Sequence, residues 1–155
     1  DDDLVEQVRL AGRLHDVGKI GIQESVLNKP GKLTPEEFLH VKEHVRIGVE
    51  ILAPLGHLGR VIEFVHDHHE HWDGSGYPRG RRGDAISPGG RVLAVADTFD
   101  ALTSRRAYRD AVDIGKTLEY MRGLRGTQLD PDALEALLEV VQERRALPFL
   151  DEHVG

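Results

Sequence analysis

Apolar residues recur along this chain at helical spacing, and this pattern most limits the folds open to it. Leu4, Val8, Ala11 and Leu14 are three or four residues apart, as on one face of a helix. No stretch shows the alternation of apolar and polar residues that is typical of a half-buried strand. The 155 residues are enough to bury a core without disulfides. The sequence therefore predicts an all-α bundle that forms a single domain over residues 1–155.

Capping residues and prolines indicate where the helices begin and end. Thr34, Pro35 and Glu37 supply an N-cap, a first-turn proline and a capping-box glutamate, so a helix should begin there. Pro54 requires that helix to stop or bend before it. In all we expect six helices: residues 4–17, 34–53, 58–71, one opening at Ser87 and Pro88, one from near Asp113, and one from Asp130 and Pro131.

The charge balance limits the partners of the chain. Asp and Glu number 27 and Lys and Arg 20, which gives a net charge of -7 at pH 7. Such a protein repels nucleic acid polymers and anionic membrane surfaces, so an anionic substrate must be captured locally. No apolar run is long enough to span a bilayer, and the acidic start is unlike a secretion signal. We therefore expect a soluble, cytoplasmic protein without membrane insertion.

Histidines and acids continue the apolar faces of four predicted helices. His15, for example, follows Val8 and Ala11 at helical spacing and so should point at the core. A lone inward histidine is more often a hydrogen-bonded core residue than a metal ligand, so the interpretation depends on the whole group. The group consists of His15, Asp16, His44, His68, His69 and Asp97.

This group has the composition of a metal site. Val92 to Ala96 is apolar on every side and predicts a central helix, and Asp97 directly follows it. A carboxylate there should be largely desolvated, which costs several kcal/mol without a compensating cation or several donors. Because the chain has no cysteine, a metal would be bound through imidazoles and carboxylates. The group exceeds what one catalytic ion usually needs, so we expect two divalent ions bridged by one carboxylate.

Four segments of the chain resemble the HD-GYP domains, a bacterial branch of the HD phosphohydrolase superfamily. They are LHDVGKIG at 14–21, KPGKLT at 29–34, HHEHWDGSGYP at 68–78 and AVADTFDALTS at 94–104. Together they cover about positions 10 to 110 in the order of the family. The resemblance implies an all-helical fold and a metal-dependent phosphodiesterase that hydrolyses the bacterial second messenger cyclic di-GMP to pGpG or GMP.

The resemblance also implies roles for individual residues. It makes metal ligands of His15, Asp16, His44, His68, His69 and Asp97. Asp16 would bridge two ions, Fe or Mn, and a metal-bridging hydroxide would be the nucleophile. Lys19 would face the phosphate and stabilise its developing charge. A lysine just after a helix-stopping glycine also favours the helix dipole without any catalytic role. Arg106 and Arg109 occupy positions that contact the ligand in the family.

A glycine-rich turn follows the two adjacent histidines. Gly74, Gly76 and Gly80 lack the spacing of a dinucleotide-binding loop, and a predicted helix rather than a strand precedes them. We expect Gly74 and Gly76 to adopt unusual backbone angles that bring Trp72 and Tyr77 near the site. Aromatic faces there could support a guanine base, while a sharp loop without ligand contacts fits the spacing equally.

Arginines form two local clusters in this acidic chain. They are Arg79, Arg81 and Arg82 after the glycine turn, and Arg105, Arg106 and Arg109 after the helix that carries Asp97. Surface arginines are usually only solvated. The positions of these clusters nevertheless predict the rim of one pocket, suited to bidentate contacts with phosphate.

The chain also departs from the family pattern. HD-GYP domains have a further helix before the His15–Asp16 pair that bears another histidine ligand, and only fourteen residues precede His15 here. One ion would then lack a ligand. We expect the chain to be a fragment of a longer protein in which a sensor or receiver domain precedes it. Two alternatives stay open: an impaired module that binds cyclic di-GMP or a protein partner, and an HD phosphohydrolase for other nucleotides.

Overall fold

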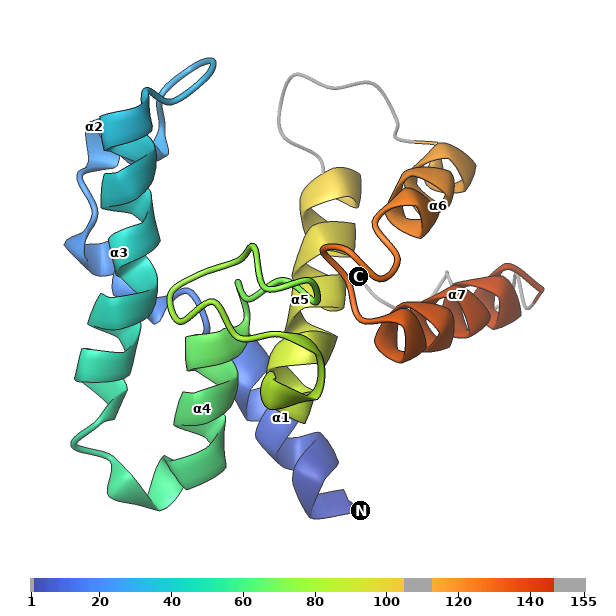
Figure 1. The fold of residues 1–155 in the computed structure, drawn as a ribbon, viewed down its shortest axis with the longest axis horizontal. Coiled ribbons are helices and arrows are strands. Elements are labelled where there is room, and N and C mark those ends of the chain that lie inside the picture. The colour runs from blue at the N-terminus through green and yellow to red at the C-terminus, as the bar shows by residue number, and fades with distance from the viewer. Residues whose placement is uncertain (1, 105–112, 147–155) are drawn as a thin grey trace, which may run out of the picture.

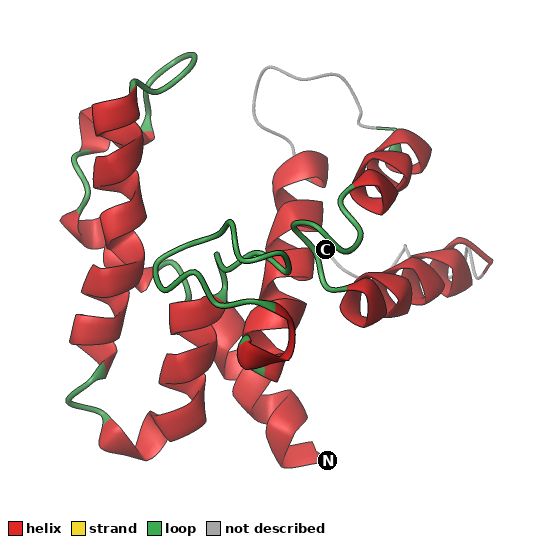
Figure 2. Cartoon of the chain, viewed as in Figure 1, coloured by secondary structure: helices red, strands yellow, loops and turns green. Residues whose placement is uncertain are grey.

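The computed structural model describes residues 2–104 and 113–146, and within them it contains helices and loops but no strand (Figures 1 and 2). The α-helices are α1 (Asp2–Leu14), α2 (Glu24–Leu27), α3 (Pro35–Leu52), α4 (Gly59–Asp67), α5 (Pro88–Thr103), α6 (Ile114–Gly123) and α7 (Pro131–Ala146). Short 3-10 helices are η1 (Val17–Gly21), η2 (Gly56–Leu58) and η3 (Gly83–Ala85). The predicted all-α fold is confirmed.

Helix α5 lies between α1 and α4 on one side and α6 and α7 on the other (Figure 1), and its residues take part in two hydrophobic clusters. Leu93 packs with Ala11, Phe64 and their neighbours from α1, α3 and α4. Val95, two residues later, packs against α6 and α7 in a second cluster that includes Met121. The helix is central, as predicted, but its apolar stretch is not buried on every side, because Val92 is 45% exposed.

The capping predictions for α3 are confirmed in detail. The Thr34 hydroxyl accepts a hydrogen bond from the Glu37 backbone N–H at 3.2 Å, and the Glu37 carboxylate accepts one from the Thr34 N–H at 2.7 Å. This reciprocal pair satisfies two backbone donors that a helix start leaves without partners. The helix then runs to Leu52, just short of Pro54.

Two helices end earlier than predicted. Helix α1 stops at Leu14 because the chain turns into η1, where the Lys19 N–H donates to the Asp16 carbonyl at 3.0 Å. Helix α4 stops at Asp67, and the Glu70 N–H donates back to the Asp67 carbonyl at 2.9 Å. The pairs His15–Asp16 and His68–His69 therefore lie just beyond the ends of two helices, where the backbone turns.

The contact between η1 and α3 is made by backbone against backbone. A Cβ atom on Gly18 would overlap the His44 carbonyl oxygen and lie 2.5 Å from the Gly48 nitrogen. Only a residue without a side chain allows this approach. The packing brings the residues that flank Gly18 alongside α3.

In the described residues no helix has the length and apolar character needed to cross a membrane.

Candidate metal centre

Three imidazoles are oriented in the same way. The Nδ1 atoms of His15, His44 and His68 lie 2.7, 2.6 and 2.6 Å from the carbonyl oxygens of the residues three positions earlier. A carbonyl can only accept, so Nδ1 carries the proton and the lone pair of the neutral ring is on Nε2. The same second-sphere bond fixes the tautomer of histidines that bind metals.

The three Nε2 atoms are buried, and none has a hydrogen-bond partner among the described residues. Buried polar atoms in native proteins nearly always have a partner, so this shared lack needs an explanation. A bound cation would be the missing partner of each Nε2 lone pair. The ligand atoms fall into two groups, His44, His68 and His69, and His15, Asp16 and His68, each within 4.8 Å.

Asp16 stands between the two histidine groups. Its Oδ2 lies 3.4 Å from His15 Nε2 and 2.8 Å from Lys19 Nζ, and its Oδ1 lies 3.8 Å from His44 Nε2. Asp97 approaches the same histidine, with Oδ1 3.5 Å from His15 Nε2. The structure thus brings all six predicted residues together, although Asp97, 34% exposed in its side chain, is less desolvated than predicted.

The surroundings favour the ligand forms of these side chains. Burial lowers the pKa of His68 to about 4 and that of His69 to about 2, so both rings are neutral at pH 7. Asp97 Oδ1 lies 3.5 Å from His15 Nε2, and this contact lowers the pKa of Asp97, which keeps it a carboxylate, and raises the pKa of His15. Neutral imidazoles and ionised carboxylates are the forms that bind a divalent ion. The donor set therefore fits a metal.

Comparison with known proteins identifies the family of the chain. The model of the HD domain family matches residues 1–133. The chain belongs to the HD domain family. The match covers both histidine groups, the glycine-rich turn and α5. The resemblance to HD-GYP domains drawn from the sequence motifs is confirmed by this match and by the relatives below.

The HD domain is similar to phosphodiesterases that are much longer. A cyclic di-GMP phosphodiesterase of Thermotoga maritima is 43% identical over 143 residues, which are 90% of this chain and 38% of that relative. A 3′3′-cGAMP-specific phosphodiesterase of Vibrio cholerae is 43% identical over 136 residues, or 86% and 26%. The crystal structure of a cyclic GMP-AMP-specific phosphodiesterase of V. cholerae shares the fold, with a TM-score of 0.68 at 21% identity over 94% of this chain and 40% of that one.

The glycine-rich turn of the HD domain brings Tyr77 to the histidines. The Tyr77 ring stacks on His69, with centroids 4.9 Å apart and planes inclined by 18°. Gly74 has the predicted unusual angle, with φ of +86°, but Gly76 does not have a positive φ. Gly76 is required for another reason, because a Cβ there would lie 2.5 Å from the His69 carbonyl oxygen. Burial raises the pKa of Tyr77 to about 12, so the phenol stays neutral.

Two buried acids that the sequence analysis missed hold this turn in place. Asp67, completely buried, accepts from the side chains of Arg79 and Arg81 and, at 2.8 Å, from the Ser87 N–H. Glu70, 2% exposed, accepts from the backbone N–H groups of Arg79 and Arg81 at 2.6 and 2.8 Å. The sequence does place these two acids next to the adjacent histidines and places arginines after the turn, and this pattern could have indicated that the acids bind the turn.

Two arginines of the first cluster have a structural role within the fold, and the phosphate-binding role predicted for them stays a prediction. The guanidinium groups of Arg79 and Arg81 are paired with Asp67, and Arg81 also donates to Glu63 at 3.0 Å. Their charges are used within the fold. Arg105, Arg106 and Arg109, which make up the second cluster, lie outside the described residues.

Asp67→Ala is expected to lower the free energy of unfolding by about 2–3 kcal/mol, because it leaves two guanidinium groups and a buried N–H without their acceptor. The arginines are about one-third exposed and regain some water, which keeps the loss below that of a fully buried pair. Urea denaturation measures it. Asp84→Ala is the matched control, since Asp84 is 92% exposed and pairs with Arg91 at the surface. Equal midpoints for the two variants would contradict the structural role of Asp67.

Proposed function

We propose that this HD domain is a metal-dependent phosphodiesterase that hydrolyses cyclic di-GMP to pGpG or GMP. One observation carries the proposal: three buried Nε2 lone pairs without partners among the described residues surround the Asp16 carboxylate. Relatives with the same domain are named as phosphodiesterases of cyclic dinucleotides, and the relative from T. maritima is named for cyclic di-GMP.

The proposed metal ligands form two sets that share Asp16. His15, Asp16 and Asp97 would hold one ion, and His44, His68, His69 and the same Asp16 would hold the other. Imidazole and carboxylate ligands suit Fe or Mn, which we propose as the native ions. Divalent ions in these positions would supply Lewis acidity toward water and toward the phosphate.

Lys19 is proposed to stabilise the charge that develops on the phosphate. Its ammonium lies 2.8 Å from Asp16 Oδ2, and its side chain is 44% exposed. One of its three N–H donors is used by Asp16, so the others can meet an anionic oxygen. Held in this way beforehand, the charge needs little rearrangement when the substrate reacts.

Tyr77, Gly76 and two arginines are the remaining proposed substrate contacts. Tyr77 is held over His69, and Gly76 allows the close turn that puts it there. Arg106 and Arg109 are proposed to contact the ligand, on the strength of the family resemblance alone. In a protein of net charge -7, these local cations and the bound ions would attract a dianionic substrate. Cytoplasmic location and a partner sensor or receiver domain stay predictions.

The test is product analysis with defined metal content. Protein prepared without oxygen is loaded with Mn or Fe, incubated with cyclic di-GMP, and the nucleotides are separated by chromatography. We expect pGpG or GMP to form, to stop after chelation and to return when metal is restored. Tight binding of cyclic di-GMP without product at saturating metal would favour the impaired module. Equal turnover of unrelated nucleotides would favour a general phosphohydrolase.

A further inference from the structure

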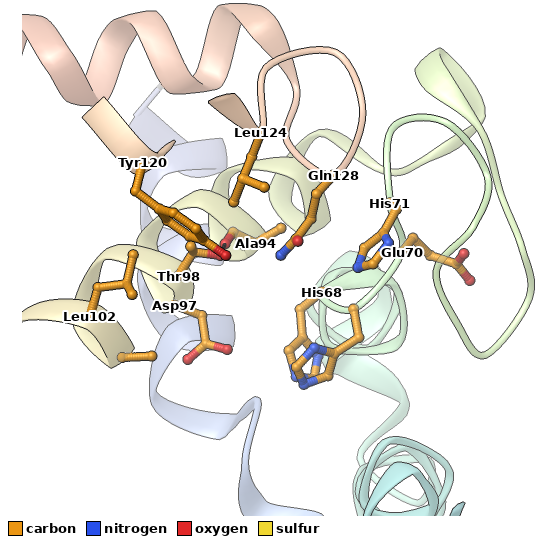
Figure 3. Close-up of a pocket in the computed structure, with 12 residues that line it drawn as sticks. His68, Glu70, His71, Ala94, Asp97, Thr98, Leu102, Tyr120, Leu124 and Gln128 are labelled. Carbon is orange, nitrogen blue, oxygen red and sulfur yellow. Dashed lines mark hydrogen bonds between the residues drawn. The ribbon is translucent and has the colours of Figure 1, made fainter. Parts of the chain in front are cut away.

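A pocket of about 260 Å³ lies directly beside the candidate metal centre (Figure 3). His68, His69 and Asp97 form one end of it, where it meets the centre. Helix α6 and the loop that follows it form the opposite wall, through Tyr120 and Gln128. Pockets that enclose a whole drug-sized ligand measure about 300–1,000 Å³, so this one is sized for a part of a larger ligand.

The two ends of the pocket differ in chemistry. The end at the metal centre is polar, because Asp97 and the two histidines line it. The far end has apolar walls from Ala94, Leu102 and Leu124, with an amide, a phenol and the His71 imidazole among them. The carboxylate of Glu70 points away from the pocket (Figure 3) and accepts from backbone N–H groups of the glycine-rich turn. A second phosphate would find no cationic side chain among the described lining residues. A flat, neutral group with polar edges fits.

Gln128 presents its amide to the pocket from a well-fixed backbone. Its carbonyl accepts from the Trp72 N–H at 3.2 Å, which ties the loop before α7 to the turn after α4. The next residue, Leu129, is completely buried in the second cluster. The side-chain amide points into the pocket in Figure 3 and has no hydrogen-bond partner among the described residues. It offers a donor and an acceptor side by side.

Tyr120 supplies an aromatic surface at the same end. Its side chain belongs to the pocket lining, yet the residue is 59% exposed, so much of the ring is not covered by the protein. Stacking on an exposed aromatic ring is a common way to bind a nucleic acid base. Tyr120 and Gln128 together provide a face contact and an edge contact for one heterocycle.

We propose that this pocket binds one purine base of the substrate, with Tyr120 stacking on the ring and Gln128 bonding to its polar edge. The inference rests on the proposed function, because a nucleotide phosphate at the metal centre would carry its base into the adjoining space. The 6-oxo and N1–H groups of guanine match the donor and acceptor of the amide. Gln128 and Tyr120 would then determine affinity for the base, not the chemistry at phosphorus.

The test measures binding and turnover separately. Gln128→Ala is expected to weaken the binding of GMP, measured by calorimetry on metal-loaded protein, by about tenfold. The same variant should raise the KM for cyclic di-GMP by a similar factor and change kcat much less. Affinity for ribose 5-phosphate, which has no base, should fall less than twofold. Gln142→Ala, an exposed glutamine on α7, is the matched control and should behave as the unmodified protein.

A second pair of variants tests the stacking contact. Tyr120→Ala should weaken GMP binding at least about fivefold, whereas Tyr120→Phe keeps the ring and should restore the affinity. Equal losses for GMP and ribose 5-phosphate, or GMP binding unaffected by Gln128→Ala and Tyr120→Ala, would overturn the base pocket. Absence of cyclic di-GMP hydrolysis would contradict the proposed function alone, because the GMP measurements decide the pocket without turnover.

Discussion

Asp16→Ala is expected to lower the turnover of cyclic di-GMP by about 10³-fold or more and to reduce the metal content of the protein. The carboxylate lies within 4 Å of His15, His44 and Lys19, so its removal affects both proposed ion sites and the lysine. The side chain is partly exposed and lies after the end of α1, so we expect the fold to survive. Turnover at saturating manganese and elemental analysis of the purified variant measure the two effects.

The control for this variant is Asp132→Ala. Asp132 is an exposed carboxylate in the first turn of α7, a helix that contributes to neither histidine group. The Asp132→Ala substitution removes the same charge from the protein and should leave turnover and metal content within about twofold of the unmodified protein. If Asp16→Ala retained both turnover and metal, Asp16 would not be a bridging ligand, and the assignment of the centre would fail.

Gly18→Ala is expected to destabilise the domain by about 3 kcal/mol or more. The added methyl group would overlap the His44 carbonyl oxygen and press on the Gly48 nitrogen, and backbone atoms in a helix cannot move aside as a flexible side chain can. Helix α3 and η1 would have to separate, which also draws His44 away from Asp16. Urea denaturation gives the stability, and a manganese titration of the folded fraction gives the affinity.

Gly123→Ala is the matched control for a glycine without such a contact. A Cβ at Gly123 would meet nothing within 4 Å, and the residue lies in the last turn of α6. Since alanine favours a helix over glycine, this variant should be unchanged or more stable by up to about 1 kcal/mol. Similar stabilities for the two variants would show that the η1–α3 contact is looser than described.

The helices could be predicted from the sequence because their signals are local. The capping box at Thr34 and the aspartate cap at Asp130 depend on residues three positions apart at most, and both are found. The ends at Leu14 and Asp67 could not be predicted, because the turns after them are held by parts of the chain distant in sequence. The first packs against α3 through Gly18, and the second is bonded through Glu70 to the glycine-rich turn. The helical spacing of inward-pointing residues continues past these two ends, because the residues in the turns are also buried, so the sequence pattern does not mark where the helices stop.

The predicted metal ligands come together because the residues that continue an apolar face must point inward with it. His44 illustrates this, since it is 2% exposed on the same side of α3 as Val45 and Gly48. Asp67 and Glu70 were missed for the opposite reason. Their partners are separated from them along the chain by a turn whose path no periodicity describes.

Hydrogen bonds within the chain orient three of the proposed histidine ligands whether or not a metal ion is bound. His15, His44 and His68 are held by carbonyls of their own helical turns, so their direction does not depend on the cation. If the chain binds divalent ions as proposed, it would still present these lone pairs toward a common point after losing them. Reloading would then be limited by the arrival of the ion and not by a search among side-chain rotamers, and it would need no refolding.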